Sequence, residues 1–233
     1  MRIKEQFKKC AKSYEEYSKI QQFGVKALVD EIKVAPKSII DLGCGSGRVY
    51  KELIDKRVEF KEFYGIDFAK EMLSLHPKES RVKLICADFN QDNTFNSLSA
   101  DILISASALQ WAKDINLTMN NCSKVANYGY FFIFTSNTFK SLHKLAEIDS
   151  PIYSKERVIK AFCANYKENK IKEFNFKLKY ESTIELLRYI QKSGVSGGLN
   201  IGYRKMKYIL DNYKLNYLEF EALLLTGESL DRY

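Results

Sequence analysis

The sequence predicts an α/β fold in which helices cover both faces of a doubly wound, mostly parallel β-sheet. Two observations carry this prediction. Short apolar segments alternate with helical patterns from residue 37 to residue 136. A glycine-rich segment, DLGCGSG at 41–47, follows the first apolar segment and precedes the first helical pattern. A strand that enters a helix through closely spaced glycines is typical of a nucleotide-binding turn.

The glycine-rich segment connects a predicted strand ending at 38–40 with a predicted helix at 49–56. Gly43 and Gly45 allow the chain to bend sharply and to approach a ligand, because neither residue carries a Cβ. Gly47 allows the helix to pack closely on the strand, and the N–H groups at the start of the helix face a bound ligand. The segment therefore predicts a ligand site.

Acidic residues mark the ends of the next two predicted strands. The second strand, 63–67, ends in Asp67, and the third, 82–87, is followed by Asp88. Asp67 follows the glycines at about the spacing at which an acid binds both ribose hydroxyls. A fourth strand, 101–105, leads into the segment ISASALQW. Because parallel strands end at one edge of the sheet, we expect these segments to surround one ligand.

The segments outside this core are predicted to cover it. Residues 1–34 form two helices separated at QQFG (21–24), the second at 25–32. A turn at Gly129 precedes a fifth strand at 130–135. A sixth strand at 172–180 and a seventh at 217–226 complete a seven-stranded sheet. Between the last two strands lie two inserted helices, which we expect to form a lid: 183–193 and 203–213.

We expect one domain, since 233 residues suffice for a single full core. Its predicted parts are a helical cover, a ligand-binding core, a lid with strand six, and the final strand: 1–34, 37–136, 137–216 and 217–226. Five scattered cysteines without a C-x-x-C pair, together with two histidines, predict reduced thiols and no metal site. No apolar run reaches a membrane span and no signal core is present, which predicts a cytoplasmic protein.

The net charge of +8 is unevenly distributed. Residues 1–40 and 151–233 carry more Lys and Arg than Asp and Glu, whereas residues 41–150 are almost balanced. Basic flanking segments favour an acidic partner or substrate. The same charge also fits solvated surfaces of no specific role, and the sequence leaves both interpretations open.

As a set, DLGCGSG, YGID (64–67), CADF (86–89) and ISASALQW (104–111) resemble the class I S-adenosylmethionine-dependent methyltransferases, which have a Rossmann-like fold. The resemblance implies that Asp67 binds the ribose and Asp88 the adenine amino group. It also implies that Phe89 packs on the adenine, while the backbone of Gly43 and Ala106 meets the methionine part. The other predicted cofactor contacts are Gln21, Asp41, Cys44, Gly45, Gly47, Phe68, Met72 and Leu109.

The outer segments resemble the malonyl-acyl carrier protein O-methyltransferases. They are FKKCAKSY, Gln21, SALQW, FKSLHKL and LLRYIQKSGV, at 7–14, 21, 107–111, 139–145 and 186–195. The resemblance implies methylation of the free carboxylate of a malonyl group on acyl carrier protein, at the start of the pimelate branch of biotin synthesis. Arg188 is the predicted cation for this carboxylate, because a guanidinium binds a carboxylate through two hydrogen bonds. The alternative is that Arg188 is a solvent-facing residue of its helix. Tyr14 is the second predicted catalytic residue and is expected to reach the amino-acid end of the cofactor; the alternative is that it is a core aromatic of its helix.

Other functions remain open. The nearest alternative is methylation of another small carboxylic acid or metabolite. A nucleic-acid methyltransferase suits the positive charge, but the sequence has no Asn/Asp-Pro-Pro-aromatic motif. A dinucleotide-dependent oxidoreductase gives Asp88 and Phe89 no role, and a non-enzymatic protein that keeps the fold is a further alternative. We expect acyl carrier protein as partner, no nucleic-acid or membrane partner, and a monomer.

Overall fold

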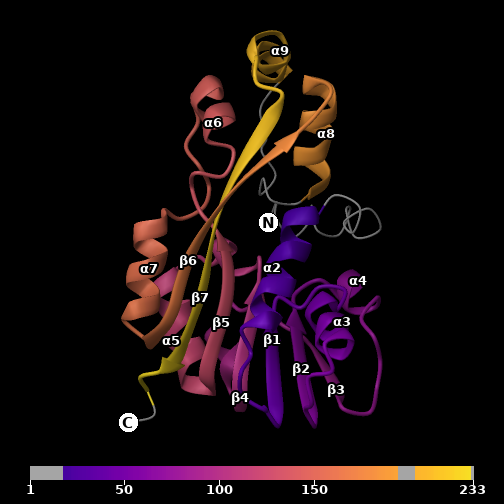
Figure 1. Cartoon of the computed structure of the whole chain (residues 1–233), viewed down its shortest axis with the longest axis vertical. Helices are drawn as coiled ribbons and strands as arrows, with labels where there is room; N and C mark the ends of the chain where they lie inside the picture. The colour runs from indigo at the N-terminus through magenta and orange to yellow at the C-terminus, as the bar shows by residue number, and fades with distance from the viewer. Residues whose placement is uncertain (1–17, 194–202, 232–233) are drawn as a thin grey trace.

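A computed structural model describes residues 18–193 and 203–231 of the chain (Figure 1). Its sheet has seven strands in the order β3-β2-β1-β4-β5-β7-β6. The first five strands pair in parallel, and β7 is antiparallel to both of its neighbours. The predicted doubly wound, mostly parallel sheet is therefore confirmed. The strands are β1 (Ser38–Leu42), β2 (Glu62–Asp67), β3 (Val82–Cys86), β4 (Ala100–Ala106), β5 (Ala126–Phe134), β6 (Tyr166–Lys179) and β7 (Tyr217–Ser229).

Helices lie on both faces of the sheet and around the far ends of its two longest strands (Figure 1). One face packs against α2 (Lys19–Asp30) and α3 (Arg48–Asp55). The other packs against α5 (Ile115–Val125) and α7 (Lys155–Cys163). A single turn, α4 (Lys70–Leu73), follows β2. The ends of β6 and β7 are surrounded by α6 (Lys140–Ala146), α8 (Thr183–Ser193) and α9 (Tyr203–Asn212).

Successive residues of the central strands pack into different cores. Ile39 belongs to the core under α2 and α3, and Ile40 belongs to the core under α5 and α7. Phe132 and Phe131 divide in the same way on β5. Because side chains alternate across a strand and both faces are covered, the central strands are apolar throughout. This explains why the sequence shows continuous apolar runs rather than alternation.

The predicted break between two helices at residues 21–24 is wrong. Helix α2 continues through Gly24 without interruption. A Cβ at Gly24 would lie 2.4 Å from the ring of Phe132 on β5. Glycine at this position therefore brings the helix close to the sheet, and it does not end the helix. Because α2 is continuous, it carries Gln21 across the edge of the sheet where β1 and β4 end.

Several strands are longer than the apolar pattern predicted. β1 extends through Asp41 and Leu42. β5 begins at Ala126, so the turn predicted at Gly129 is wrong, and a Cβ on this residue would approach the ring of Tyr166 to 2.7 Å. β6 begins at Tyr166, where charged residues alternate with half-buried ones in an edge strand that hides only one face. The predicted bounds of α8 are confirmed.

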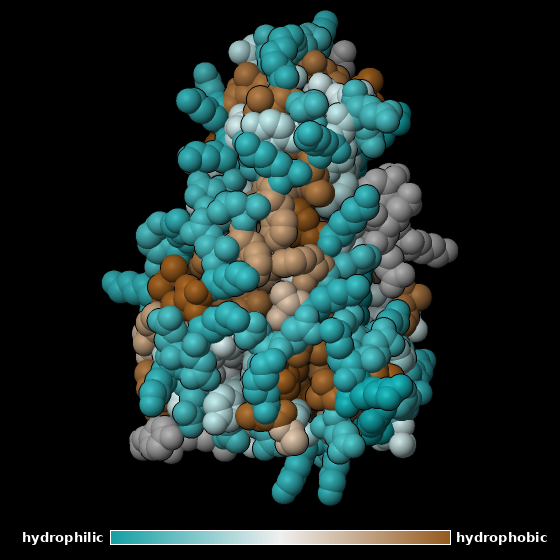
Figure 2. All heavy atoms as spheres, in the orientation of Figure 1, coloured by the Kyte–Doolittle hydropathy of each residue, from teal (hydrophilic) through white to brown (hydrophobic). Residues whose placement is uncertain are grey.

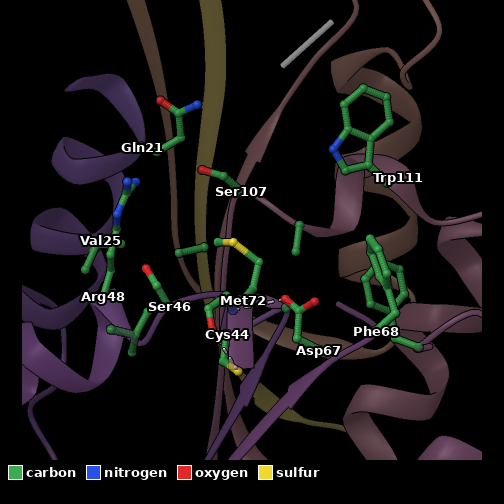
Figure 3. A pocket seen from close by; sticks show the side chains of 16 residues that line it. Gln21, Val25, Cys44, Ser46, Arg48, Asp67, Phe68, Met72, Ser107 and Trp111 are labelled. Atoms are coloured by element: carbon green, nitrogen blue, oxygen red, sulfur yellow. Dashed lines mark hydrogen bonds between the residues drawn. The ribbon is translucent and has the colours of Figure 1, made fainter. Parts of the chain in front are cut away.

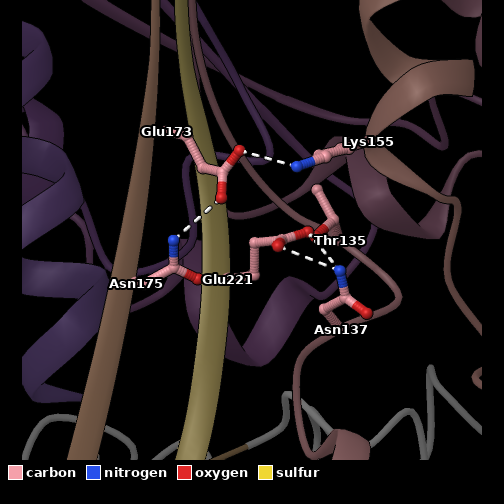
Figure 4. Close-up of polar contacts among 6 residues, drawn as sticks. All are labelled: Thr135, Asn137, Lys155, Glu173, Asn175 and Glu221. Atoms are coloured by element: carbon pink, nitrogen blue, oxygen red, sulfur yellow. Dashed lines mark hydrogen bonds and ion pairs between the residues drawn. The ribbon is translucent and has the colours of Figure 1, made fainter.

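A polar network ties the end of β5 to β7 (Figure 4). Glu221 on β7 is buried and accepts hydrogen bonds from the Thr135 hydroxyl and from Nδ2 of Asn137, the latter at 2.9 and 3.1 Å. Nearby, Lys155 at the start of α7 pairs with Glu173 on β6 at 2.9 Å. These contacts hold the segment after β5 to β6 and β7. Helix α6 follows in the same segment.

The outer strand β6 presents a row of charged side chains, and Figure 2 shows hydrophilic residues over much of this face of the molecule. Lysines on an edge strand discourage pairing with a second chain, because they would have to be desolvated in the new sheet. Within the described residues, no helix combines the length and apolar character needed to span a bilayer.

Candidate functional site

The glycine turn after β1 is fastened to the end of β2. The N–H groups of Gly43 and Cys44 both donate to the carbonyl of Ile66, at 2.8 and 3.0 Å. Gly43 has a φ of +81°, and a Cβ there would lie 2.3 Å from the methyl group of Ala108 in the segment after β4. Only glycine combines this conformation with so close an approach. Three strand ends therefore meet at the turn.

Asp67 lies at the end of β2 and orders the same turn. Its Oδ2 accepts from the N–H of Gly45 at 3.0 Å, and its Oδ1 accepts from the N–H of Ala69 at 2.8 Å. Burial raises the pKa of this carboxyl, and the two backbone donors act in the opposite direction. A carboxylate fixed in this way keeps lone pairs for the two hydroxyls of a ribose.

A cavity opens at these strand ends (Figure 3). Most of its lining is apolar, with a few polar side chains. The lining residues are Gln21, Val25, Gly43, Cys44, Gly45, Ser46, Arg48, Val49, Asp67, Phe68, Met72, Phe89, Ala106, Ser107, Ala108 and Trp111.

Asp41 lies at the carboxyl end of β1, next to this cavity but outside its lining. Its side chain is 1% exposed, and neither carboxyl oxygen has a hydrogen-bond partner within the described residues. Burial and, to a lesser degree, the charge of Asp67 raise its pKa well above the usual value. A buried, unpaired carboxyl is costly, so its presence favours a cationic or hydrogen-bond-donating ligand near the turn.

Nine of the predicted site residues line the cavity together: Gln21, Gly43, Cys44, Gly45, Asp67, Phe68, Met72, Phe89 and Ala106. Four others lie elsewhere. Gly47 precedes α3 with a φ of +84°, and Leu109 is fully buried in the core under α5 and α7. Asp88 accepts from the N–H and the side-chain amide of Asn90, at 3.0 and 3.1 Å. Asp41 is the fourth.

The two predicted catalytic residues are not among the residues that line the cavity. Tyr14 lies outside the described residues. Arg188 is exposed on α8 and is absent from the lining. The role assigned to each of them stays a prediction.

Sequence reasoning missed several lining residues, above all Arg48, Ser107 and Trp111. Arg48 directly follows the last glycine of the turn, so its position was a usable signal. Ser107 and Trp111 belong to a segment that the sequence singled out without assigning either side chain a task. Ser107 has a positive φ of 61°, unusual for a residue other than glycine, and no sequence pattern reveals such a conformation.

A family described as "Methyltransferase domain" matches residues 33–194, more than half of the chain. The chain belongs to this methyltransferase family. The membership confirms the predicted class, a methyltransferase that uses S-adenosylmethionine. It also agrees with the position of the cavity, because the matched region supplies all but two of the lining residues, Gln21 and Val25.

Curated relatives of the methyltransferase are similar at modest identity. A malonyl-acyl-carrier protein O-methyltransferase 2 of Coxiella burnetii is 27% identical over 84% of this chain and 81% of its own length. A malonyl-acyl-carrier protein O-methyltransferase of Acetivibrio thermocellus is 30% identical, over 59% of this chain and 50% of its own. The match therefore spans about half of the second relative.

Solved structures share the fold. The YcgJ protein from Bacillus subtilis superimposes with a TM-score of 0.62 at 15% identity, covering 88% of this chain and 97% of its own. Geranyl diphosphate C-methyltransferase from Streptomyces coelicolor A3(2) gives 0.56 at 12% identity, covering 88% of this chain and 75% of its own. At these identities the comparison establishes a common architecture, including the seven-stranded sheet.

The residues of the cavity fit S-adenosylmethionine. The carboxylate of Asp67 suits the ribose hydroxyls, and Phe68, Phe89 and Met72 offer apolar surfaces for the adenine ring. The glycine turn leaves room for close backbone contact with the amino-acid part. Bound there, the cofactor supplies an electrophilic methyl group. The protein's task is then to hold the acceptor in line with that group and to exclude water.

Proposed function

We propose that this methyltransferase converts the free carboxylate of a malonyl group on acyl carrier protein into its methyl ester. The proposal is supported by the similarity to the Coxiella burnetii protein across most of both chains. A sequence identity of 27% leaves the acceptor open, so the proposal must also agree with the chemistry of the cavity.

The observation that carries the proposal is the state of the titratable side chains in the described lining of the cavity. Asp67 is held by backbone N–H groups. Burial, followed by the charges of Asp41 and Asp67, raises the pKa of the Cys44 thiol well above its usual value, so the thiol stays protonated. Arg48 contributes a guanidinium group to the lining. An acceptor that is already an anion suits this environment.

A carboxylate is such an acceptor, because it is ionised at neutral pH and needs no general base. One of its oxygens forms the new bond to the methyl carbon, and the bond from that carbon to sulfur breaks with its electron pair remaining on sulfur. Two opposite charges disappear in this step. An apolar cavity that excludes water therefore favours it over the separated, solvated ions.

Two arginines are candidates for the cation that pairs with the carboxylate. Arg48 lines the cavity, whereas Arg188 lies on α8 and would have to approach as the helices around β6 and β7 close over the acceptor. We propose that α6, α8 and α9 act as this lid. The basic residues of α7 and α9 would then meet the acidic carrier protein: Arg157, Lys160, Arg204, Lys205 and Lys207.

The test is a methyl-transfer assay with labelled S-adenosylmethionine. Malonyl-acyl carrier protein, malonyl-coenzyme A and a panel of free dicarboxylates serve as acceptors, and mass spectrometry locates the new ester. We expect the carrier-bound malonyl group to give the highest kcat/KM, with a rate that falls as salt is added. Expression of the gene in a biotin-requiring strain that lacks its own carboxyl methyltransferase should restore growth without biotin.

A different ranking of acceptors contradicts the proposal. If a soluble dicarboxylate is methylated and the malonyl thioesters are not, the chain is a metabolite carboxyl methyltransferase, which is the alternative that the sequence also favours. If no carboxylate is methylated while S-adenosylmethionine still binds, the acceptor belongs to another chemical class.

A further inference from the structure

Two hydrogen-bond donors in the cavity are buried without a partner. They are the hydroxyl of Ser107 and the indole N–H of Trp111, and neither makes a hydrogen bond within the described residues. Both side chains line the same cavity. Leaving a buried donor unpaired is costly, so two such donors facing one cavity favour a ligand that accepts hydrogen bonds.

The backbone between these residues is held in place by several hydrogen bonds. The N–H of Ser107 donates to the carbonyl of Phe132 at 2.8 Å, and Nε2 of Gln110 donates to the carbonyl of Ser107 at 2.7 Å. The hydroxyl of Tyr153 donates to the carbonyl of Ala112 at 2.9 Å. These contacts maintain the left-handed conformation of Ser107, with its φ of 61°. The two donors therefore stand on a firmly supported turn.

The donors lie apart from the side chains that suit the nucleoside. Figure 3 shows Gln21, Ser107 and Trp111 toward one end of the cavity, and Cys44, Asp67 and Phe68 toward the other. The indole nitrogen of Trp111 lies on the side of its ring that is nearer to Ser107. Two donors at the end away from the ribose-binding carboxylate suit a ligand that offers acceptor oxygens.

We infer that the hydroxyl of Ser107 and the indole N–H of Trp111 bind one oxygen of the acceptor's carboxylate, an inference that rests on the proposed function. A carboxylate accepts through both oxygens, and hydrogen bonds to a charged acceptor are stronger than those between neutral groups. With one oxygen held by this pair, the other is free to face the methyl group. An amine acceptor has a single lone pair, which the methyl transfer itself uses, so it would leave both of these donors unpaired.

The chain contains a single tryptophan, so its fluorescence reports directly on this site. The wild-type protein is first saturated with S-adenosylhomocysteine and then titrated with malonyl-coenzyme A or with its methyl ester. We expect the carboxylate to change the emission of Trp111 and to bind at least about tenfold more tightly than the ester. Equal binding of acid and ester would overturn the inference.

Two variants remove the donors with little change in shape. Trp111→Phe keeps an aromatic ring, and Ser107→Gly removes the hydroxyl at a position where glycine accepts the positive φ. We expect kcat/KM for the malonyl acceptor to fall about 10- to 100-fold in each, while calorimetry gives an unchanged Kd for S-adenosylhomocysteine. Ser74→Ala, which removes an exposed hydroxyl outside the cavity, should leave both quantities unchanged.

The outcomes separate this inference from the proposed function. If the wild type methylates no malonyl acceptor, the proposed function fails. If the wild type is active and either variant keeps its kcat/KM, the inference fails and the function stands. A loss that appears in the affinity for S-adenosylhomocysteine assigns the donors to the cofactor's own carboxylate, which also overturns the inference.

Discussion

The carboxylate of Asp67 accepts a hydrogen bond from the backbone N–H of Gly45 at 3.0 Å, so the end of β2 holds the turn that follows β1. One side chain thus supports the shape of the turn and faces the cavity that the turn borders. Loss of the carboxylate should therefore lower ligand affinity twice: through the lost contact with the ligand and through a less well ordered turn.

Replacing Asp67 with alanine should raise the Kd for S-adenosylhomocysteine by about 10- to 100-fold, because the charge-assisted hydrogen bonds that we predict to the ribose would be lost. Isothermal titration calorimetry measures this change. Asp101→Ala is a matched control, since Oδ2 of Asp101 accepts from the backbone N–H groups of Lys37 and Ser38 at the opposite edge of the sheet. The Asp101→Ala control should lose stability and keep its affinity for S-adenosylhomocysteine. Equal affinities in the two variants would contradict the assignment of Asp67 to the ligand site.

The buried carboxyl of Asp41 should lower the free energy of unfolding of the ligand-free protein as the pH rises. Its pKa is raised in the folded state, so the folded chain binds more protons than the unfolded chain above about pH 4. The free energy of unfolding therefore loses this contribution with increasing pH. An asparagine side chain in its place cannot ionise. We expect the stability of Asp41→Asn relative to wild type to increase between about pH 5 and pH 8, measured by urea unfolding without ligand. A constant difference would show that Asp41 has an ordinary pKa.

The two candidate arginines can be separated by kinetics. Arg48→Met retains much of the apolar stem in the cavity and removes the charge, and Arg188→Leu does the same on α8. The residue that pairs with the acceptor carboxylate should lose at least about 100-fold in kcat/KM for malonyl-acyl carrier protein, since a charged partner is removed. The Kd for S-adenosylhomocysteine is measured in parallel, to show that each variant still binds the cofactor product. Unchanged turnover in Arg188→Leu would contradict the predicted role of Arg188.

Gly24→Ala should destabilise the protein by about 1–3 kcal/mol, because the added methyl group would be forced against the ring of Phe132. In a helix with free space alanine would instead be stabilising, so the sign of the change is informative. Lys26→Ala, an exposed position of the same helix, should be nearly neutral. Thermal unfolding of the three proteins tests this, and a stabilised Gly24→Ala would contradict the close contact.

His143 on α6 should make the region around α6 and β7 sensitive to acid. It is 7% exposed, and burial lowers the pKa of its ring despite the opposing charge of Glu219. The unfolded chain then takes up a proton below about pH 6.5 more readily than the folded chain, so stability falls with falling pH. The stability of wild type relative to His143→Leu should decrease between about pH 7 and pH 5. A pH-independent difference in urea unfolding would rule this out.

The sequence predicted the order of strands and helices well where a local pattern decides the structure. Helix α8 has the bounds predicted from its apolar spacing and from the glycine that follows it in the sequence, because both signals act locally. The glycines of the turn and the acid at the end of β2 predicted the ligand site for the same reason. Gly24 and Gly129 were misread as breaks, since their small size serves contacts with Phe132 and Tyr166, which lie far away along the chain.

The cavity was predicted less completely than the fold. Asp67 and Phe68 were predicted correctly to line the cavity, because their place at the end of β2 can be seen in the order of the sequence. Ser107 lines the cavity with a left-handed backbone conformation, and Trp111 lies in a short 3-10 helix. No spacing rule predicts either feature. Arg48 was missed because the glycine pattern ends one residue before it and assigns no role to the residue that follows.

The antiparallel β7 lies between β5 and β6 and pairs with both. During synthesis on the ribosome, β5 therefore keeps an open hydrogen-bonding edge until residues 217–229 have emerged from the exit tunnel. A chain arrested before that point would expose the apolar edge of β5 to chaperones and to other nascent chains. Translation through the final strand, more than formation of the nucleotide turn, should set the moment at which the polypeptide becomes resistant to proteases.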